Sequence, residues 1–416
     1  MAPVDETRRA YQEEVGRALG VSLDRRILAF HAEAPAPSKA RLVTDWSRPL
    51  RPAARPRRTI TTVPDKVLDA PGLVDDYYLN LLDWSCHNVL GVGLDRTVYL
   101  WNATTADVCE LMTVPDSDGI TSLRFSADGG FLAVGLHSGD TQIWDVAGRR
   151  KVRSMLGHAA RVGVLAWDRH ILSSGCRDGS IWHHDVRIAR HKTAELLAHT
   201  AEVCGLTWRS DGGMLASGGN DNMVYLWDAR TTAAPAFARS DHTAAVKALA
   251  WCPWELHLLA SGGGSHDRML HFWNASTGQR LSSIDTGSQV TSITWSRHYK
   301  ELLTTHGFPD NHLSIWNYVR QSKVVDLPGH DARVLHAAQS PDGQVVATGA
   351  ADENINFWKA FEYTGDKSKR AGAAGATRAA SALAHGGGNT GSNGGDGSAA
   401  DGGGSHALMA NRMTIR

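Results

Sequence analysis

Short segments in which apolar and polar residues alternate recur along most of the chain. A clear example is Val162–Trp167, which ends in an aromatic residue. Alternation with a period of two is typical of a β-strand that has one buried face. We find seven such segments, and the residues that end them are Trp84, Phe125, Trp167, Trp208, Trp251, Trp295 and Gln339.

A second set of seven positions follows the first in step, with 40 to 46 residues between successive members. Its members are Trp101, Trp144, His184, Trp227, Trp273, Trp316 and Trp358. Between the two sets, each repeat has a Ser- and Gly-rich strand and a turn that contains Asp, as in Leu215–Asn222. This period, with dipeptides such as Trp144-Asp145, is typical of a propeller blade of four short strands. The pattern therefore predicts an all-β fold, a seven-bladed β-propeller.

Ring closure and the flanking regions can also be predicted. The last repeat has no fourth strand after Trp358, whereas the segment Asp65–Pro71 stands where an outer strand would precede the first repeat. We expect this segment to complete the seventh blade, because closure removes open sheet edges. The predicted domains are a mostly disordered region with a short helix (1–64), the propeller (65–360) and a disordered Gly/Ala/Ser-rich tether (361–416).

The helix is expected to begin at a cap on Asp5 and to end at Gly20, with Tyr11, Val15 and Leu19 on one face. A Pro- and Arg-rich segment follows it, which we interpret as extended and basic. A solvated linker without a specific partner explains that segment equally well.

Charge and cysteine content narrow the function classes. Lys plus Arg and Asp plus Glu both number 43, so neither nucleic acid nor a membrane surface is expected as a partner. No CxxC pair occurs, and we expect all five cysteines to be reduced core residues: Cys86, Cys109, Cys176, Cys204 and Cys252. With no signal peptide and no apolar run of membrane-spanning length, the protein is expected in the nucleus and cytoplasm.

Four His/Asp pairs recur with similar spacing: His158 with Asp178, His199 with Asp221, His242 with Asp267, and His330 with Asp352. An active site is needed once, so a pair repeated in successive blades indicates a structural hydrogen bond that Ser and Trp extend. No nucleophile elbow, phosphate-binding loop or HExxH motif is found. The expectation is a protein that is not an enzyme and has no cofactor and no metal.

Several segments outside the repeat resemble the Fizzy family of WD40 activators of the anaphase-promoting complex. They are Asp75–Trp84, Arg161–Gly163, Glu202–Leu206, Ala216–Asn222, Ala245–Trp254, Thr286–Val290 and Ala351–Glu353. His183–Val186 and Trp251–Trp254 are more similar to the mitotic Fizzy branch than to the Fizzy-related branch.

The resemblance implies an adaptor that recruits substrates to this ubiquitin ligase through destruction-box and Lys-Glu-Asn-box degrons. For the destruction-box arginine it points to Asp76 and Glu353, which ring closure would make neighbours. For the Lys-Glu-Asn box it points to Asp83, Asn220, Asn222, Ser265, Gln289 and Arg333. Five of the six lie at turns between second and third strands or at the starts of first strands, and we expect these around one end of the channel. A solvated acidic pair, and asparagines that only complete a turn, are the plainer alternatives.

The resemblance also implies how the chain attaches to the ligase. A helical-repeat scaffold subunit would bind the terminal Ile415 and Arg416, and a further attachment motif matches Arg26, Ile27 and Leu28 in part. Arg41, Leu42, Val43 and Pro49 lie in a segment similar to one that adds as a strand to a spindle-checkpoint protein. The family's upstream Asp-Arg-Phe/Tyr-Ile-Pro box is not found before Asp65, which leaves a chain that begins after the box or a different attachment.

The expected partners are therefore subunits of the anaphase-promoting complex, degron-containing substrates such as mitotic cyclins and securin, and spindle-checkpoint proteins. The alternative is a general WD40 scaffold or a receptor of a different ubiquitin ligase. Loss of ligase association on deletion of Ile415 and Arg416 would separate these hypotheses.

Overall fold

The computed structural model describes residues 6–20 and 58–363. The chain divides into two compact units, Met1–Thr59 and Ile60–Arg416. The described part of the first unit contains the helix α1 (Glu6–Ala18), and Gly20 follows it with a φ of 67°. The predicted helix is confirmed, although its proposed cap, Asp5, lies outside the described residues. Tyr11, Val15 and Leu19 are all exposed.

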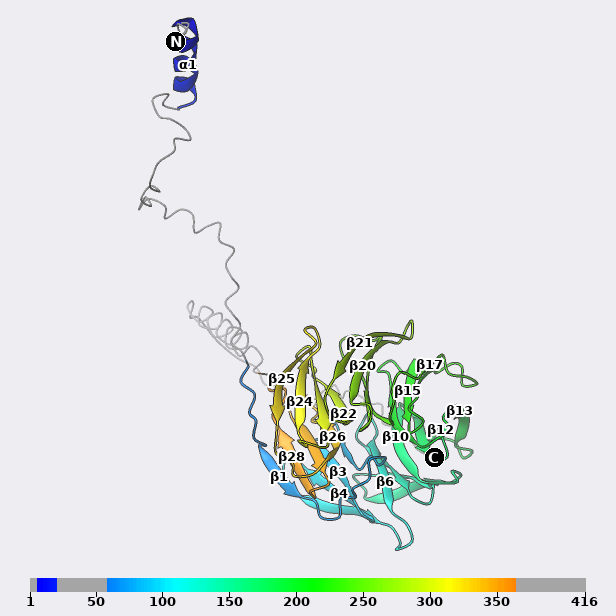
Figure 1. Ribbon diagram of the computed structural model, residues 1–416. Helices are drawn as coiled ribbons and strands as arrows, with labels where there is room; N and C mark the ends of the chain where they lie inside the picture. Colours follow the sequence, from blue (N-terminus) through cyan, green and yellow to red (C-terminus); the bar gives the residue numbers. More distant parts are fainter. Residues whose placement is uncertain (1–5, 21–57, 364–416) are drawn as a thin grey trace, which may run out of the picture. The chain divides into compact units, whose positions relative to one another are not determined.

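The second unit is a propeller of seven four-stranded antiparallel sheets (Figure 1). The first strands of the blades are β2 (Leu82–Trp84), β6 (Ile120–Phe125), β10 (Val162–Asp168), β14 (Val203–Trp208), β18 (Val246–Trp251), β22 (Val290–Trp295) and β26 (Val334–Gln339). The second strands are β3 (Val89–Leu94), β7 (Phe131–Leu136), β11 (Ile171–Cys176), β15 (Met214–Gly219), β19 (Leu258–Gly263), β23 (Glu301–His306) and β27 (Val346–Ala350).

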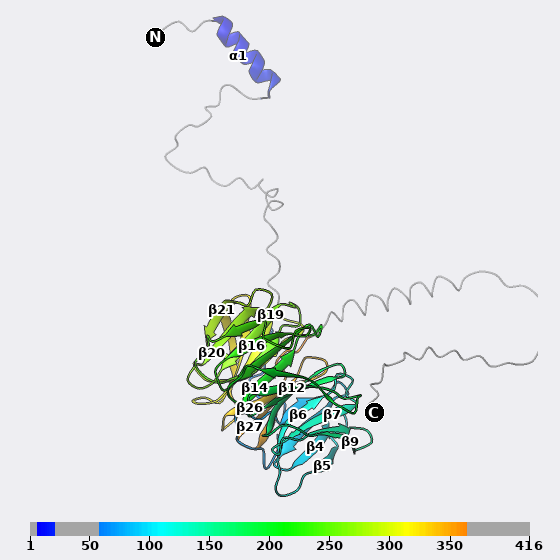
Figure 2. The ribbon, with the colours of Figure 1, turned by 90° about the vertical axis from the view of Figure 1, so that its right-hand side faces the viewer.

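The third strands are β4 (Thr97–Asn102), β8 (Thr141–Asp145), β12 (Ser180–Asp185), β16 (Val224–Asp228), β20 (Met269–Asn274), β24 (Leu313–Asn317) and β28 (Asn354–Trp358). The fourth strands are β5 (Val108–Thr113), β9 (Arg150–Met155), β13 (Lys192–Leu197), β17 (Phe237–Arg239), β21 (Gln279–Asp285), β25 (Ser322–Leu327) and, for the seventh blade, β1 (Lys66–Asp69). Figure 2 shows the propeller from a second direction.

The two sets of recurring residues, which we call the first and second columns, both have a structural explanation. The first column lies in the first strands and the second in the third strands, as predicted. Several first-column side chains join neighbouring blades: the Trp251 indole donates to the carbonyl oxygen of Thr207 and the Trp295 indole to that of Ala250. The amide of Gln339 donates to the carbonyl oxygen of Trp295, 3.2 Å away. Gln339 can replace tryptophan in the column because it supplies the same N–H donor.

The predicted ring closure is confirmed. Strand β1 pairs with β28 antiparallel over four residue pairs, from Lys66 with Phe357 to Asp69 with Asn354. In Figure 1 the blue β1 accordingly lies beside the orange β28. The backbone N–H of Asp65 extends this pairing with a bond of 2.7 Å to the carbonyl oxygen of Phe357. The first and last parts of the propeller therefore share one sheet.

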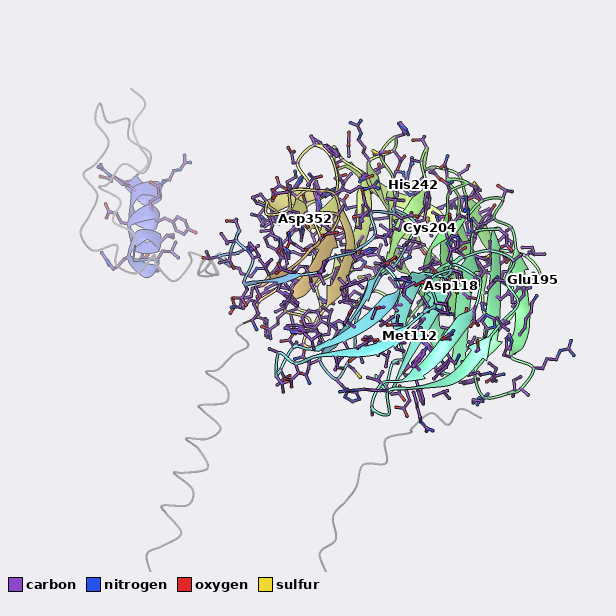
Figure 3. The ribbon with its side chains drawn as sticks, turned by 90° about the horizontal axis from the view of Figure 1, so that it is seen from below. Met112, Asp118, Glu195, Cys204, His242 and Asp352 are labelled. Atoms are coloured by element: carbon purple, nitrogen blue, oxygen red, sulfur yellow. The ribbon has the colours of Figure 1, made fainter. Side chains whose placement is uncertain are left out.

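Burial decreases from the inner to the outer strands. The inner β15 is buried at every position, whereas most positions of the outer β9 are exposed. In Figure 3 the buried Cys204 is seen among the inner strands and Glu195 near the rim. The core therefore lies in the inner layers of each blade, around the channel.

The cysteine prediction is only partly right. All five thiols are free, and Cys176, Cys204 and Cys252 are buried. Cys86, however, is exposed and Cys109 is half-buried, so the prediction that they are core residues is wrong for Cys86. Cys86 follows the short first strand β2, where the chain turns at the surface. Among the residues that the structure describes, no helix has the length and apolar character that a membrane span needs.

Candidate functional site

One end of the propeller carries a polar cavity of about 690 Å³, which we call the polar mouth. The side chains at this mouth come from the segment before β2, from turns between second and third strands, and from the starts of first strands. Its polar residues include Asp75, Asp76, Tyr78, Asn220, Asn222, Ser265, Gln289 and Arg333. Five of the six residues predicted for the Lys-Glu-Asn box thus line a single cavity.

Backbone geometry places the two asparagines at this mouth. Asn222 has a φ of 65° in the turn between β15 and β16, and asparagine adopts this left-handed conformation more readily than most residues. The N–H of Asn220 donates to the carbonyl oxygen of Glu202, which ties the turn to the start of β14. The Tyr78 hydroxyl donates to Asn220 Oδ1 at 3.0 Å, so the orientation of this amide is fixed.

Arg161 binds two acidic residues of the mouth region at once. Its Nη1 lies 2.7 Å from Asp76 Oδ2, and its Nε lies 2.7 Å from Glu202 Oε1. The Arg161 and Glu202 side chains are 13% and 7% exposed, so this pair is largely removed from water. Burial by itself would lower the pKa of Arg161, but the hydrogen bonds to Glu202 and Asp76 outweigh it and raise the pKa. Asp76 is thus already paired.

A second ion pair borders the mouth. Arg333 Nε lies 2.5 Å from Asp75 Oδ1, and its Nη2 donates to the Asp75 carbonyl oxygen. Within residues 58–363, its third nitrogen, Nη1, has no hydrogen-bond acceptor. Arg333 therefore keeps one charged donor available in a cavity that also exposes amide and hydroxyl groups.

The predicted acidic pair has two different sets of partners. Glu353 Oε1 accepts a hydrogen bond of 3.2 Å from the N–H of Gly72, and Asp76 binds Arg161. Asp76 lines the polar mouth, and Glu353 is not among the lining residues of that cavity. A shared role for the two carboxylates in binding an arginine stays a prediction.

Asp83 is the one residue of the six that does not line the polar mouth. It lies within β2 and lines the central channel, not the polar mouth. Its Oδ2 accepts a hydrogen bond of 2.7 Å from the N–H of Phe125, and Arg124 Nη1 lies 3.4 Å from Oδ1. Burial raises the pKa of Asp83 more than Arg124 lowers it. The carboxylate thus joins blades one and two, and Asp83 lies apart from the five residues at the mouth.

The repeated His/Asp pairs form structural networks in three of the four blades where we predicted them. In the fourth blade, His199 Nδ1 lies 3.0 Å from Asp221, and Ser217 Oγ bonds both His199 Nε2 and the Trp227 indole. The fifth and seventh blades repeat this arrangement with His242 and His330. Their recurrence agrees with the structural interpretation.

In the third blade no hydrogen bond joins His158 to Asp178, so a direct pair there is wrong. The ring of His158 instead bonds Ser174 at 2.7 Å and Ser180 at 3.3 Å. His184 takes the place of the tryptophan and bonds the same Ser174 hydroxyl at 2.8 Å. Blade three therefore keeps a buried hydrogen-bond network, but His184 replaces the tryptophan and Ser180 replaces the aspartate as the partner of His158.

The predicted attachment residues lie outside the described residues. They are Arg26, Ile27, Leu28, Arg41, Leu42, Val43, Pro49, Ile415 and Arg416. Their roles stay predictions.

Sequence reasoning missed Asp75, Tyr78, Arg161 and Glu202 as residues that build the mouth. A periodic signal for two of them was present. Arg161, Glu202, Gln289 and Arg333 each immediately precede the valine that starts a first strand. Residues at this repeat position face the same end of the propeller. The repeat positions of Gln289 and Arg333 therefore also predict Arg161 and Glu202 at this end.

Comparison with known proteins agrees with this architecture. Residues 68–358 match the family model described as the CDC20/Fizzy WD40 domain. The chain is 54% identical to the WD repeat-containing protein slp1 of Schizosaccharomyces pombe, over 86% of this chain and 74% of the relative. It is 52% identical to the anaphase-promoting complex subunit cdc20 of Dictyostelium discoideum, over 73% of this chain and 62% of the relative.

A solved structure is also similar. A chain of the crystal structure of the mitotic checkpoint complex matches with 53% identity and a TM-score of 0.72, covering 82% of this chain and all of that chain. By comparison, FIZZY-RELATED 3 of Arabidopsis thaliana is 46% identical over 74% of this chain and 64% of its own length. The chain therefore belongs to the CDC20/Fizzy family of WD40 propeller proteins, and its similarities fit the mitotic branch.

Proposed function

We propose that this protein is a substrate-recruiting cofactor of the anaphase-promoting complex and binds degron peptides on its propeller. Two kinds of observation support the proposal. Relatives from two organisms carry names that describe a subunit or cofactor of this complex. The polar mouth, which carries most weight, gathers five residues that are far apart in the sequence into one cavity.

The chemistry of the mouth suits a Lys-Glu-Asn peptide. Arg333 Nη1 would pair with the glutamate in a charge-assisted hydrogen bond. Asn220, Asn222 and Gln289 provide amides that can both donate to and accept from the asparagine and the peptide backbone. Because Asp83 lies in the channel, we assign the peptide lysine to Asp75, whose side chain is 54% exposed beside Arg333.

Fluorescence anisotropy with a labelled Lys-Glu-Asn peptide and the full chain tests this proposal. Arg333→Ala should weaken binding by roughly 10-fold or more, since a hydrogen bond to a charged group is worth about 1.5–3 kcal/mol. Gln289→Ala should weaken it by roughly 2- to 10-fold, since a hydrogen bond between neutral groups is worth about 0.5–1.5 kcal/mol. The matched controls are Gln279→Ala on β21 and Arg320→Ala after β24, which remove exposed side chains away from the mouth. Equal affinities for mouth variants and controls would refute the mouth as the peptide site.

For the destruction box, we propose that Glu353 is the main acceptor of the peptide arginine. Asp76 contributes through Arg161 and Tyr78, whose N–H donates to Asp76 Oδ1 at 2.9 Å. Glu353→Gln removes the charge and keeps the shape, whereas Asp76→Ala would also break the Arg161 pair. Glu353→Gln should therefore weaken a destruction-box peptide selectively and leave the Lys-Glu-Asn peptide unaffected. Unchanged destruction-box binding would exclude this site.

Attachment to the ligase is the part of the proposal that depends on the tails. We propose that Ile415 and Arg416 dock on a helical-repeat subunit, with Arg26, Ile27 and Leu28 as a second contact. A spindle-checkpoint protein would engage Arg41, Leu42, Val43 and Pro49. Deleting residues 415–416 should reduce co-purification with the complex while peptide binding stays intact. If co-purification is unaffected, the chain is a scaffold of another kind.

We also propose that the protein acts in the nucleus and cytoplasm, where the ligase's cell-cycle substrates, mitotic cyclins and securin among them, would be met. Imaging of a fluorescent fusion tests this directly. Confinement to a membrane compartment would contradict it.

A further inference from the structure

The fifth blade departs from its neighbours at one position beside the His/Asp network. Two residues before the third-strand tryptophan, blade four has Tyr225 and blade seven has Asn356, but blade five has His271. Tyr225 and Asn356 both contact the network histidine of their blade. Only in blade five, among these three, does a second imidazole stand beside the network histidine.

His271 is buried and lacks hydrogen-bond partners. It is 2% exposed, and neither Nδ1 nor Nε2 has a partner within the described residues. A buried polar group left without a hydrogen bond costs about 1–3 kcal/mol, so such a residue needs an explanation. The ring lies 4.5 Å from the ring of His242, centroid to centroid, and is tilted by 38°.

An aspartate completes the cluster. One ligand atom from each of His242, Asp267 and His271 lies within 4.8 Å of the other two. Thr243 holds Asp267 Oδ1 through its N–H and its hydroxyl, at 3.0 and 3.1 Å, while Oδ2 faces His242 Nδ1 at 2.6 Å. We propose that His242, Asp267 and His271 form a metal site that takes a zinc ion.

The chemistry of the three side chains suits zinc. His271 offers ring nitrogens that have no hydrogen-bond partner within the described residues, so a nitrogen lone pair is available to a metal ion. The carboxylate of Asp267 is held in place by Thr243, which bonds its Oδ1 twice. Two imidazoles and one carboxylate favour zinc over calcium or magnesium, which prefer oxygen ligands.

The surroundings also resemble the support that metal ligands need. His242 Nε2 lies 2.7 Å from Ser261 Oγ, which also accepts from the Trp273 indole. Metal-bound histidines commonly use their other nitrogen in this way, which fixes the ring orientation. The turn that carries Asp267 also carries Ser265 and His266, which line the polar mouth. A bound ion would therefore stiffen one wall of that mouth.

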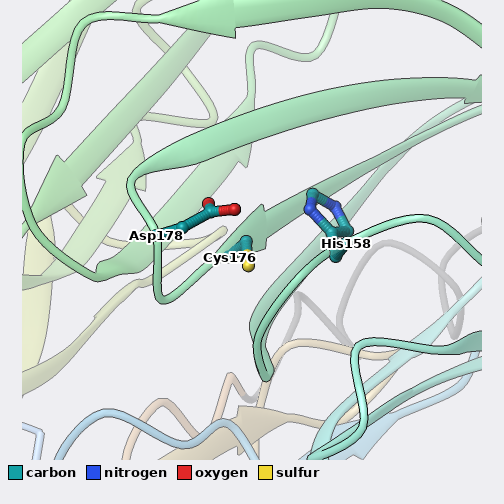
Figure 4. Close-up of side chains that lie close together, drawn as sticks. All are labelled: His158, Cys176 and Asp178. Carbon is teal, nitrogen blue, oxygen red and sulfur yellow. The ribbon is translucent and has the colours of Figure 1, made fainter.

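A second cluster in blade three provides the comparison. His158, Cys176 and Asp178 also have ligand atoms within 4.8 Å of one another (Figure 4). Here, however, both nitrogens of His158 bond serine hydroxyls, and the Cys176 thiol donates to the Ala160 carbonyl oxygen. This cluster has no unpartnered buried imidazole of the kind that His271 supplies in blade five, so the blade-three cluster serves as a control.

Isothermal titration with zinc ion alone, on the full chain after treatment with a chelator, tests the site. We expect one zinc ion to bind tightly per chain and to raise the melting temperature. When Co²⁺ replaces zinc, we expect the visible absorption of tetrahedral cobalt. His271→Phe should abolish all three, while the melting temperature of the metal-free protein stays similar, since blade four carries an aromatic ring at this position. His271→Tyr provides a second version of the test.

Cys176→Ser should bind zinc as the unchanged chain does. The proposal is overturned if the folded chain takes up no stoichiometric zinc, if both His271 variants bind it equally well, or if Cys176→Ser abolishes binding.

Discussion

The ammonium nitrogen of Lys247 lies 2.8 Å from the carbonyl oxygen of Leu335, which links blade five to blade seven inside the channel. Lys247 is 6% exposed, and its nitrogen lies 5.6 Å from the centre of the Tyr77 ring. Among the described residues, no carboxylate forms an ion pair with it. Burial, the largest effect, lowers the pKa of Lys247 to about 7, whereas its ordinary value is 10.5.

This shift predicts a pH-dependent stability. Between about pH 7 and 10.5 the unfolded chain holds a proton on Lys247 that the folded protein has released. The unfolded state then binds more protons, so the free energy of unfolding should rise with pH across this window. Lys247→Met keeps the apolar stem and removes the charge, and urea unfolding at pH 6, 7, 8 and 9 should show a flatter profile for this variant.

The control for that measurement is Lys151→Met, since Lys151 is exposed on β9. Its profile should follow that of the unchanged protein. Burial also raises the pKa of Cys204 to about 12, which lowers stability above about pH 9, so the comparison ends there. An equally steep rise in Lys247→Met would show that Lys247 does not cause it.

The repeat made most of the fold predictable. Trp251 and Trp295 recur because each joins its blade to the previous one, and Gln339 could be counted with them since it performs the same donation. The closing strand was predictable from simple arithmetic, because only β1 remained to complete the last blade. These features follow from backbone pairing, which a periodic sequence reveals directly.

Side-chain partners were less predictable, because they depend on contacts between distant segments. Asp83 and Asp76 are seven residues apart in one segment, yet one bonds the N–H of Phe125 and the other pairs with Arg161. Nothing in the local sequence shows which carboxylate faces the channel and which the mouth. Similarly, Ser180 bonds the His158 ring through its hydroxyl and Asp178 through its N–H, and the spacing of His158 and Asp178 alone does not reveal this arrangement.

Removing the shared hydroxyl of a His/Asp network should destabilise the fold. Ser217 is fully buried, and its Oγ bonds both the Trp227 indole and His199. Ser217→Ala leaves each of these groups without its partner, at about 1–3 kcal/mol apiece. Chemical denaturation measures the loss, and Ser276→Ala, at an exposed turn, should be close to neutral. A neutral Ser217→Ala would argue against a structural role for the network.

Strand β1 should be required for a stable ring. A chain that begins at residue 71 lacks β1 and exposes the edge of β28, whereas a chain that begins at residue 58 keeps it. We expect the shorter chain to unfold at lower temperature and to aggregate, because an unpaired edge strand can pair with other molecules. Thermal melts and light scattering of both chains give the comparison. Equal melting temperatures would show that closure by β1 contributes little.

The ion pairs of Arg161 with Asp76 and Glu202 should stabilise the fold as well as hold Asp76 at the mouth. Arg161→Met leaves Glu202 buried and Asp76 partly buried without their cation, and breaking a buried ion pair costs about 3–5 kcal/mol. The value here should fall toward the lower end, since the Asp76 side chain is 26% exposed. Urea unfolding of the variant measures it, and Arg161→Met combined with Glu202→Gln should recover part of the loss.

A matched variant of an exposed ion pair tests whether burial causes the loss of stability in Arg161→Met. Arg150→Met breaks a surface contact with Asp145, in which the arginine side chain is 77% exposed, and should change stability little. If the two single variants lose the same stability, burial is not the cause. If the double variant is no more stable than Arg161→Met alone, the loss arises from packing of the arginine side chain and not from the uncompensated charge on Glu202.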